Sequence, residues 1–279
     1  MESRGDRHAS SAIHLHEWIW SIWLKEQQPP RLEYKRFRYV EFVEDETKRS
    51  EAENALAKLL YEYHTRLPVD TNLLAHLKYR QLASVLTGSF DQRPRDRRTR
   101  SGNFIEILAC ELAKRLGYDI PVLRLQYNPN RDQSMKGDDI LGFREMSGEA
   151  SGNRILVGEG KFRSDFEMEA VKEAYNGLKV KVRSGPISME FVAAILSREG
   201  DKQMAAKILQ LRKQVFQQDP NITQEYLLFL GTVGQPRSPF KYLEEYNDGL
   251  LSNMVAMNVV FQAGLQDWLD QVYEQEYRH

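Results

Sequence analysis

The chain has 279 residues, of which 41% are hydrophobic and 28% are charged, and its formal net charge is -1 at pH 7. This composition is typical of a folded globular protein and excludes a disordered or fibrous chain. The near-neutral charge gives no general attraction to nucleic acid, so any such contact must come from a local patch. Cys110 is the only cysteine, which excludes an internal disulfide and a cysteine-based zinc site, and predicts a core residue in a reducing cytoplasm.

The N-terminal segment is aromatic but does not have the pattern of a membrane span. Its most apolar stretch, residues 13–24, is interrupted by two histidines and a glutamate and is too short to cross a bilayer. We therefore predict no membrane partner, and a packing surface that faces either the rest of the chain or another protein. The residues that form this surface are Trp18, Trp20 and Trp23.

Residues 1–100 are predicted to form a mainly helical region that packs on the rest of the chain or docks a partner. Alternating side chains over residues 37–42 indicate a strand. Ser50 and Glu53 match a capping box and predict a helix that ends near Pro68. A second helical pattern covers residues 73–82.

An arginine-rich segment, residues 91–100, marks the boundary with the second region, residues 101–279. It contains five arginines and two aspartates. Arginine binds phosphate through paired hydrogen bonds, so the segment is a candidate nucleic-acid contact, although a solvated linker explains the same composition. The candidate contact residues are Arg93, Arg95, Arg97, Arg98 and Arg100.

The second region is predicted to contain an α/β core from residue 101 to about residue 232. Apolar residues at helical spacing predict a helix over 104–116 that Gly117 ends. Strands are predicted at 120–127, 139–143 and 154–161. Ser164 and Glu167 match a second capping box before a helix with one apolar face, which begins at Met168.

The remaining elements complete this core. We predict mainly helix over 189–217, strands at 226–230 and 255–261, and a closing helix at 265–272. From residue 223 onward there are eight acidic and three basic residues, so this end is not expected to contact nucleic acid.

The motif Glu159-Gly160-Lys161 is the candidate catalytic element. Two residues apart in a strand, the Glu159 carboxylate and the Lys161 ammonium point to the same face. The same spacing also starts at Glu33 and at Glu46, and in isolation it fits a surface ion pair. Only the copy at Glu159 lies at the end of an apolar strand. It also follows a predicted strand that begins with Asp139, and it precedes a predicted helix. This context predicts a functional site.

Asp139 and Glu159 are the predicted ligands of a divalent cation, Mg²⁺ or Mn²⁺, with the carbonyl oxygen of Gly160 as a further ligand. Mg²⁺ uses one or two protein carboxylates and completes its shell with water and substrate phosphate. Such an ion activates water for phosphodiester hydrolysis. Lys161 is expected to orient that water or to neutralise developing charge. Glu106, on the preceding helix, is expected to support these ligands or to bind a second metal ion.

Asp138 competes with Asp139 for the ligand role. Neighbouring side chains of a strand point to opposite faces, so the two carboxylates should not both enter one site. We favour Asp139 because it directly precedes Ile140, the first apolar residue of the strand.

The helix after the motif also carries basic residues that could extend a basic surface. Four acidic residues share the helix region, so we predict a solvated face instead. The basic residues are Lys172, Lys179, Lys181 and Arg183.

The order helix, strand, strand, strand, helix, strand, with Glu106, Asp139 and the Glu159 motif on the matching elements, resembles the core of the PD-(D/E)xK nuclease superfamily. The resemblance implies a restriction-endonuclease-like α/β fold, with a mixed sheet flanked by helices. The usual leading proline is absent, and Gly137 with the two aspartates stands in its place.

More narrowly, the chain resembles the HamA family, the nuclease-like subunits of Hachiman anti-phage defence systems. The resemblance rests on residues 101–106, 136–139 and 158–162 and on overall length. It implies a metal-dependent nuclease that hydrolyses phosphodiester bonds of DNA under the control of a helicase partner (HamB). The alternative is a nuclease-like binding module that docks on and regulates the helicase with little or no hydrolysis.

Overall fold

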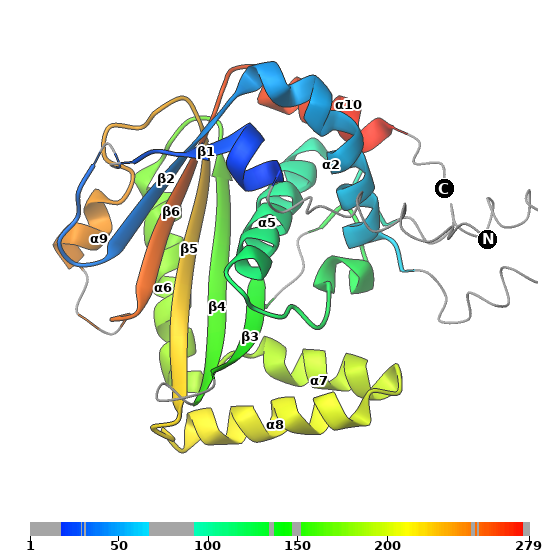
Figure 1. Cartoon of the computed structure of the whole chain (residues 1–279), viewed down its shortest axis with the longest axis vertical. Helices are drawn as coiled ribbons and strands as arrows, with labels where there is room; N and C mark the ends of the chain where they lie inside the picture. The colour runs from blue at the N-terminus through cyan, green and yellow to red at the C-terminus, as the bar shows by residue number, and fades with distance from the viewer. Residues whose placement is uncertain are drawn as a thin grey trace, which may run out of the picture.

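The described residues fold around one mixed six-stranded sheet. The computed structural model describes residues 18–275 except 29, 31, 67–91, 134–136, 147–151, 247–248 and 250. The strand order is β1-β2-β6-β5-β4-β3; the inner pairs are parallel, and β1 and β3 are antiparallel at the two edges (Figure 1). The strands are β1 Leu24–Glu26, β2 Arg38–Glu44, β3 Ile140–Met146, β4 Gly152–Arg163, β5 Ile222–Val233 and β6 Met254–Phe261.

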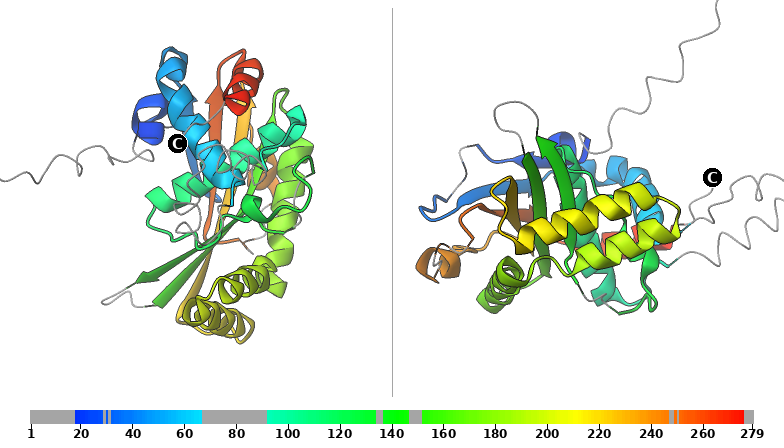
Figure 2. Two further views of the ribbon diagram at one scale, coloured as in Figure 1. Left: turned by 90° about the vertical axis from the view of Figure 1, so that its right-hand side faces the viewer. Right: turned by 90° about the horizontal axis from the view of Figure 1, so that it is seen from below.

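Helices cover both faces of the sheet, which confirms the predicted α/β class (Figures 1 and 2). The first face packs against α2, α5 and α10, the second against α6, and α7 and α8 form a hairpin across one end. The helices are α2 Arg49–His64, α5 Arg97–Arg115, α6 Met168–Ser184, α7 Ser188–Arg198, α8 Lys202–Phe216, α9 Lys241–Tyr246 and α10 Leu265–Glu274, with shorter turns η1 Ile19–Trp23, η2 Glu46–Lys48 and η3 Arg124–Tyr127. Within the described part of the chain, no helix combines the length and apolar character of a membrane span.

The inner strand β4 is apolar on both sides because each side faces a buried core. Leu156 belongs to the core under α5, whereas Ile155 and Val157 belong to the core under α6. A strand buried on both faces loses polar alternation, which explains the continuous apolar run in the sequence.

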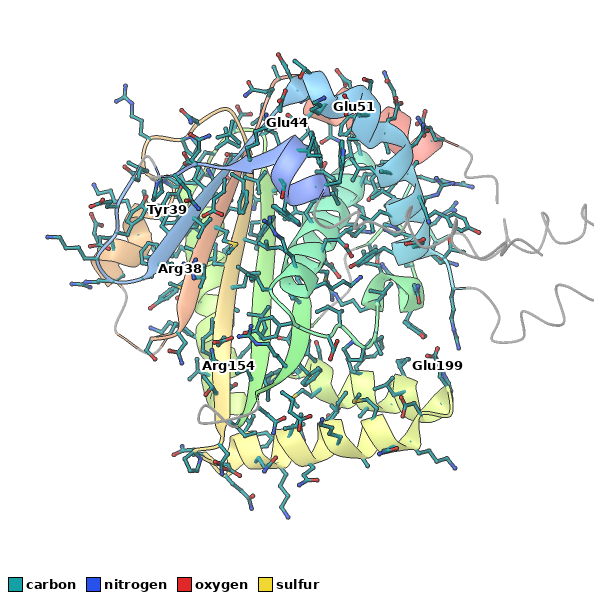
Figure 3. All side chains as sticks on the ribbon, in the orientation of Figure 1. Arg38, Tyr39, Glu44, Glu51, Arg154 and Glu199 are labelled. Atoms are coloured by element: carbon teal, nitrogen blue, oxygen red, sulfur yellow. The ribbon has the colours of Figure 1, made fainter. Side chains whose placement is uncertain are left out.

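The course of β4 sets the position of the candidate motif in the sheet. Arg154, at the beginning of the strand, lies near the hairpin, and Glu44 of β2 lies toward the opposite end of the sheet (Figure 3). Glu159 and Lys161 therefore lie in the second half of β4. At that level α5 packs on one face of the strand and α6 on the other.

The N-terminal tryptophans pack within the chain. Trp20 and Trp23 are buried, and the ring centroid of Trp20 lies 4.9 Å from that of Phe42. Trp18 is partly buried against the same core. Packing within the chain is therefore confirmed for these residues.

The predicted boundary at residue 100 falls inside a continuous helix. α5 begins at Arg97, where the carboxylate of Asp96 accepts a 2.8 Å hydrogen bond from the backbone of Thr99. β1 and β2 also extend the same sheet as the later strands. The described part of residues 1–100 therefore shares a sheet and a hydrophobic core with the second region.

One predicted strand is wrong, and both capping boxes are wrong. Residues 120–127 form an irregular segment that ends in η3, since Pro121 lacks the N–H that a strand ladder needs. The helices α2 and α6 are confirmed, but neither has a side-chain hydrogen bond at its N-cap. The predicted helix at 73–82 lies outside the described residues.

The other predicted elements are confirmed. β2, β3, β4, β5, β6 and α10 form where the patterns predict them. The helical stretch 189–217 is divided into α7 and α8 by a turn at residues 199–201. Cys110 is buried in α5, as expected for a core residue.

Candidate active site

Asp139 and the β4 motif meet at the start of β3. Ile140 pairs with Gly158 in the antiparallel ladder, so the residues just outside this pair, Asp139 and Glu159, lie side by side. The carboxylate oxygen Oδ2 of Asp139 accepts a 3.0 Å hydrogen bond from the backbone N–H of Gly160. A Cβ on Gly160 would lie 3.2 Å from the side chain of Ile105, so the glycine allows α5 to approach closely.

Glu159 and Lys161 extend on the same side of β4, as the alternation predicts. The ammonium nitrogen of Lys161 lies 3.3 Å from Oε1 of Glu159. Their side chains are 15% and 25% exposed, so both reach solvent at the edge of the site. A substrate can therefore contact this pair without opening the core.

Arg124 joins Glu106 to Asp139. Its guanidinium donates two hydrogen bonds of 2.7 Å to the two carboxylate oxygens of Glu106, and a third of 2.8 Å to Oδ1 of Asp139. The planar guanidinium suits this paired geometry. Glu106 itself is 6% exposed. It therefore acts on the site through Arg124 and not by direct contact with solvent.

Lys181 of α6 makes the corresponding connection on the other side. Its ammonium lies 2.7 Å from Oε2 of Glu159 and 2.9 Å from Oδ1 of Asp138. The prediction of a solvated face is wrong for this residue, because Lys181 is only 9% exposed. It lies three positions after the buried Leu178, on the apolar side of α6.

The two neighbouring aspartates have different surroundings. Asp138 and Ser188 exchange hydrogen bonds: the Asp138 N–H donates to the Ser188 hydroxyl at 2.8 Å, and the Ser188 N–H donates to Asp138 Oδ2 at 3.0 Å. Asp138 is thus fixed to the first turn of α7 with a 1% exposed side chain, whereas the Asp139 side chain is 17% exposed. Asp139 is the more accessible of the two.

Burial and charge repulsion raise the pKa of two acids of this site, Glu106 and Asp139. Burial raises the pKa of Glu106 to about 7, against the opposing effect of Arg124. Burial, and then the neighbouring Glu159 carboxylate, raise the pKa of Asp139. Burial alone would lower the pKa of Lys181, but the adjacent carboxylates outweigh it and raise that pKa. The site is therefore a dense set of coupled charges, as is common at functional sites.

The donor set is compatible with a hard divalent cation held by two carboxylates. Among the described residues, no group of three or more His, Cys, Asp or Glu side chains is arranged to hold a metal ion. Mg²⁺ needs only one or two carboxylates, and each carboxylate oxygen has a second lone pair beyond its present contact. A cavity of about 20 Å³ between Glu106, Arg124 and Asp139 has room for about one water molecule.

The arginine-rich segment lies against the acidic helix α10. Arg97 and Arg100 form ion pairs with Asp270, and Arg93 donates hydrogen bonds to the backbone oxygens of Tyr273 and Gln275. These three side chains hold α10 against the start of α5. The remaining two, Arg95 and Arg98, are exposed.

Arg124 and Lys181 are the site residues that the sequence analysis did not identify. Arg124 lies in the segment wrongly predicted as a strand, where nothing distinguishes it from other surface arginines. Lys181 did carry a signal, because a lysine on the apolar stripe of a helix requires a buried partner.

The fold and the site together define an α/β protein whose mixed sheet carries a charged, partly open site where β3 begins beside β4. The sequence model of the HamA family matches residues 13–255, a range that includes every residue of this site. The chain belongs to the HamA family. It is similar to the Hachiman protein HamA of Bacillus cereus, with 33% identity over 195 residues that cover 68% of each chain. The resemblance to the HamA family is confirmed.

Proposed function

We propose that this protein is a metal-dependent nuclease of a Hachiman anti-phage defence system, and that it hydrolyses phosphodiester bonds of DNA. The observation that supports the proposal is the convergence of Asp139, Glu159 and Lys161: Asp139 is bonded to the backbone of the Glu159 motif at 3.0 Å, and Lys161 lies 3.3 Å from Glu159. A site that only stabilised the fold would not require two partly exposed carboxylates beside a partly exposed lysine.

Each residue has a specific role in the proposed reaction. Asp139 and Glu159, with the carbonyl oxygen of Gly160, hold Mg²⁺ or Mn²⁺. When bound, such an ion lowers the pKa of coordinated water and polarises a phosphoryl oxygen. Lys161 orients the attacking water or neutralises the negative charge that develops on the phosphate. Glu106 fixes Arg124, which in turn positions Asp139.

The relative from Bacillus cereus is named a Hachiman protein, and this name supports the proposed place in a defence system. We propose a helicase subunit as the partner that controls the nuclease. A DNA nuclease can also cleave the genome of the cell that produces it. Such an enzyme requires control, since unregulated cleavage of that genome would be lethal.

The proposal is tested with the purified chain and supercoiled plasmid DNA. We expect nicked and linear DNA to appear with Mg²⁺ or Mn²⁺ and to disappear with excess EDTA. The assay is run for the chain alone and with the proposed helicase partner, because the partner can hold the nuclease inactive or activate it. Absence of metal-dependent cleavage in both arrangements would overturn the proposal.

The alternative function is a nuclease-like module that docks on and regulates the helicase with little hydrolysis. One observation favours it: Arg124 and Lys181 contact the two candidate ligands, so each ligand already has a cationic partner. This alternative predicts that Glu159→Gln leaves the helicase affinity and ATPase rate of the complex unchanged, while no cleavage is detected in any metal. Metal-dependent cleavage that disappears in Glu159→Gln would exclude it.

A further inference from the structure

Two buried cations each contact one of the candidate metal ligands. Arg124 lies 2.8 Å from Asp139, and Lys181 lies 2.7 Å from Glu159. Their side chains are only 10% and 11% exposed. Each cation also binds a second carboxylate that is more deeply buried, so both are fixed from two directions.

The two cations reach the site from opposite sides of the sheet. Arg124 comes from η3 and is anchored by Glu106 of α5 on the first face. Lys181 comes from α6 on the second face and is anchored by Asp138. The candidate ligands therefore lie between two positive charges that belong to separate structural elements. Neither cation depends on the other for its position.

The site needs such charges when no metal ion is bound. It gathers four carboxylates in a partly buried volume, where like charges repel more strongly than in water. A metal ion would neutralise them, and before it binds the nearby cationic side chains do so in part. Lys161 contributes one charge at the exposed edge, and the two buried cations neutralise the interior.

We propose that Arg124 and Lys181 are the built-in counter-cations of this metal site: they hold Asp139 and Glu159 in position before a divalent cation binds, and their positive charge weakens the binding of that cation. This inference rests on the proposed metal-binding function. It assigns to both residues a positioning role that sets the metal affinity, and with it the metal concentration at which the enzyme becomes active.

Two opposing effects follow from removing one of these charges. Loss of positioning weakens metal binding by up to about tenfold, the usual effect of ordering one or two side chains. Loss of a positive charge within several ångströms of a divalent ion strengthens binding by more than about tenfold, even with extensive solvent screening. The charge effect is the larger, so we expect a net gain in affinity.

The experiment measures Mn²⁺ binding to the full chain by isothermal titration calorimetry and thermal unfolding in EDTA. The charge-removing variants are Lys181→Gln and Arg124→Gln. The charge-retaining variants are Lys181→Arg and Arg124→Lys. The matched controls are Lys172→Gln on the exposed part of α6, where Lys172 contacts Glu169, and Arg131→Gln, which follows η3.

We expect Lys181→Gln and Arg124→Gln to bind Mn²⁺ at least about tenfold more tightly than the wild type and to unfold at lower temperature in EDTA. The charge-retaining variants and the controls should bind within about threefold of the wild type. If Arg124→Gln does not fold, Lys181→Gln decides the result, because Lys161 still contacts Glu159 in that variant.

Equal or weaker Mn²⁺ binding in Lys181→Gln, with normal binding by the wild type, overturns the inference and leaves the proposed nuclease intact. If the wild type binds no Mn²⁺, or if Asp139→Asn binds as the wild type does, the proposed metal site fails and the inference fails with it. The two failures are therefore distinguishable.

Discussion

The ammonium of Lys181 lies 2.7 Å from Oε2 of Glu159, although the two residues are 22 positions apart and belong to different elements. This contact ties α6 to β4 at the level of the candidate site. It also means that Glu159 is fixed by two lysines, since Lys161 contacts the other carboxylate oxygen at 3.3 Å. Lys161 is the more exposed of the two, with a side chain 25% exposed against 11% for Lys181.

The buried acid Glu106 should make stability depend on pH. Burial raises its pKa from 4.5 to about 7, so between these values the folded state keeps a proton that the unfolded state releases. The free energy of unfolding therefore falls as pH rises through this range. We expect wild type to lose about 2 kcal/mol more than Glu106→Gln between pH 5 and pH 7.

Urea unfolding at several pH values measures this difference. The comparison of the two pH slopes cancels the contributions of groups that both proteins share, such as Asp139. Parallel slopes for wild type and Glu106→Gln would show that Glu106 is ionised throughout, held in that form by Arg124.

The close contact between β3 and β4 predicts a specific glycine requirement. A Cβ on Gly158 would lie 2.9 Å from the Cβ of Ile140, directly across the strand pair that positions the site. We expect Gly158→Ala to lower the free energy of unfolding by about 1–3 kcal/mol through overpacking. The same substitution should reduce cleavage, because it displaces Glu159.

Gly177 on α6 provides the matched control, since a Cβ there meets nothing within 4 Å. Gly177→Ala should be neutral or raise stability by up to about 1 kcal/mol, because alanine is the better helix former. Urea denaturation of both variants tests the prediction. It fails if Gly158→Ala is as stable as Gly177→Ala.

The arginine-rich segment should divide into two functional groups. Arg97 and Arg100 are paired with Asp270 of α10, whereas the exposed Arg95 and Arg98 form no ion pair with any other described residue. If the segment contacts DNA, the exposed pair is the better candidate. We expect the double variant Arg95→Gln and Arg98→Gln to weaken DNA binding and to reduce the salt dependence of log affinity by about one to two units.

Fluorescence anisotropy with a labelled duplex over a range of salt concentrations provides the measurement. Lys172→Gln is the control for a general loss of positive charge. An unchanged salt dependence in the double variant would show that Arg95 and Arg98 do not contact DNA.

The sequence could predict the elements that bury apolar faces. Two elements form as predicted: the strand with the continuous apolar run at 155–157, and the helix with one apolar face that begins at Met168. Their sequence patterns reflect local burial against this sheet. The strand prediction for residues 120–127 was wrong because the apolar residues of this segment pack against the core without strand pairing. Pro121 was the local signal against a strand.

The site could be predicted only in part. The motif at Glu159 and the aspartate upstream are recognisable because a strand period fixes their relative orientation. Arg124 is not, since its role depends on which turn folds over β4. Lys181, on the apolar side of its helix, indicates a buried partner, but a single sequence does not show which carboxylate that partner is.

The central claim is that Asp139, Glu159 and Lys161 hydrolyse DNA with a divalent metal ion. The most direct measurement is the Mg²⁺-dependent cleavage rate of Glu159→Gln and Lys161→Met, compared with Glu145→Gln and Lys207→Met. The last two disrupt an exposed ion pair of 2.8 Å between β3 and α8, away from the site. Circular dichroism confirms that each variant is folded.

We predict that both site variants lose at least about 100-fold in cleavage rate, a typical effect of removing a group that stabilises the transition state. The two control variants should cleave at the wild-type rate. Cleavage by Glu159→Gln or Lys161→Met at the rate of the controls would contradict the account.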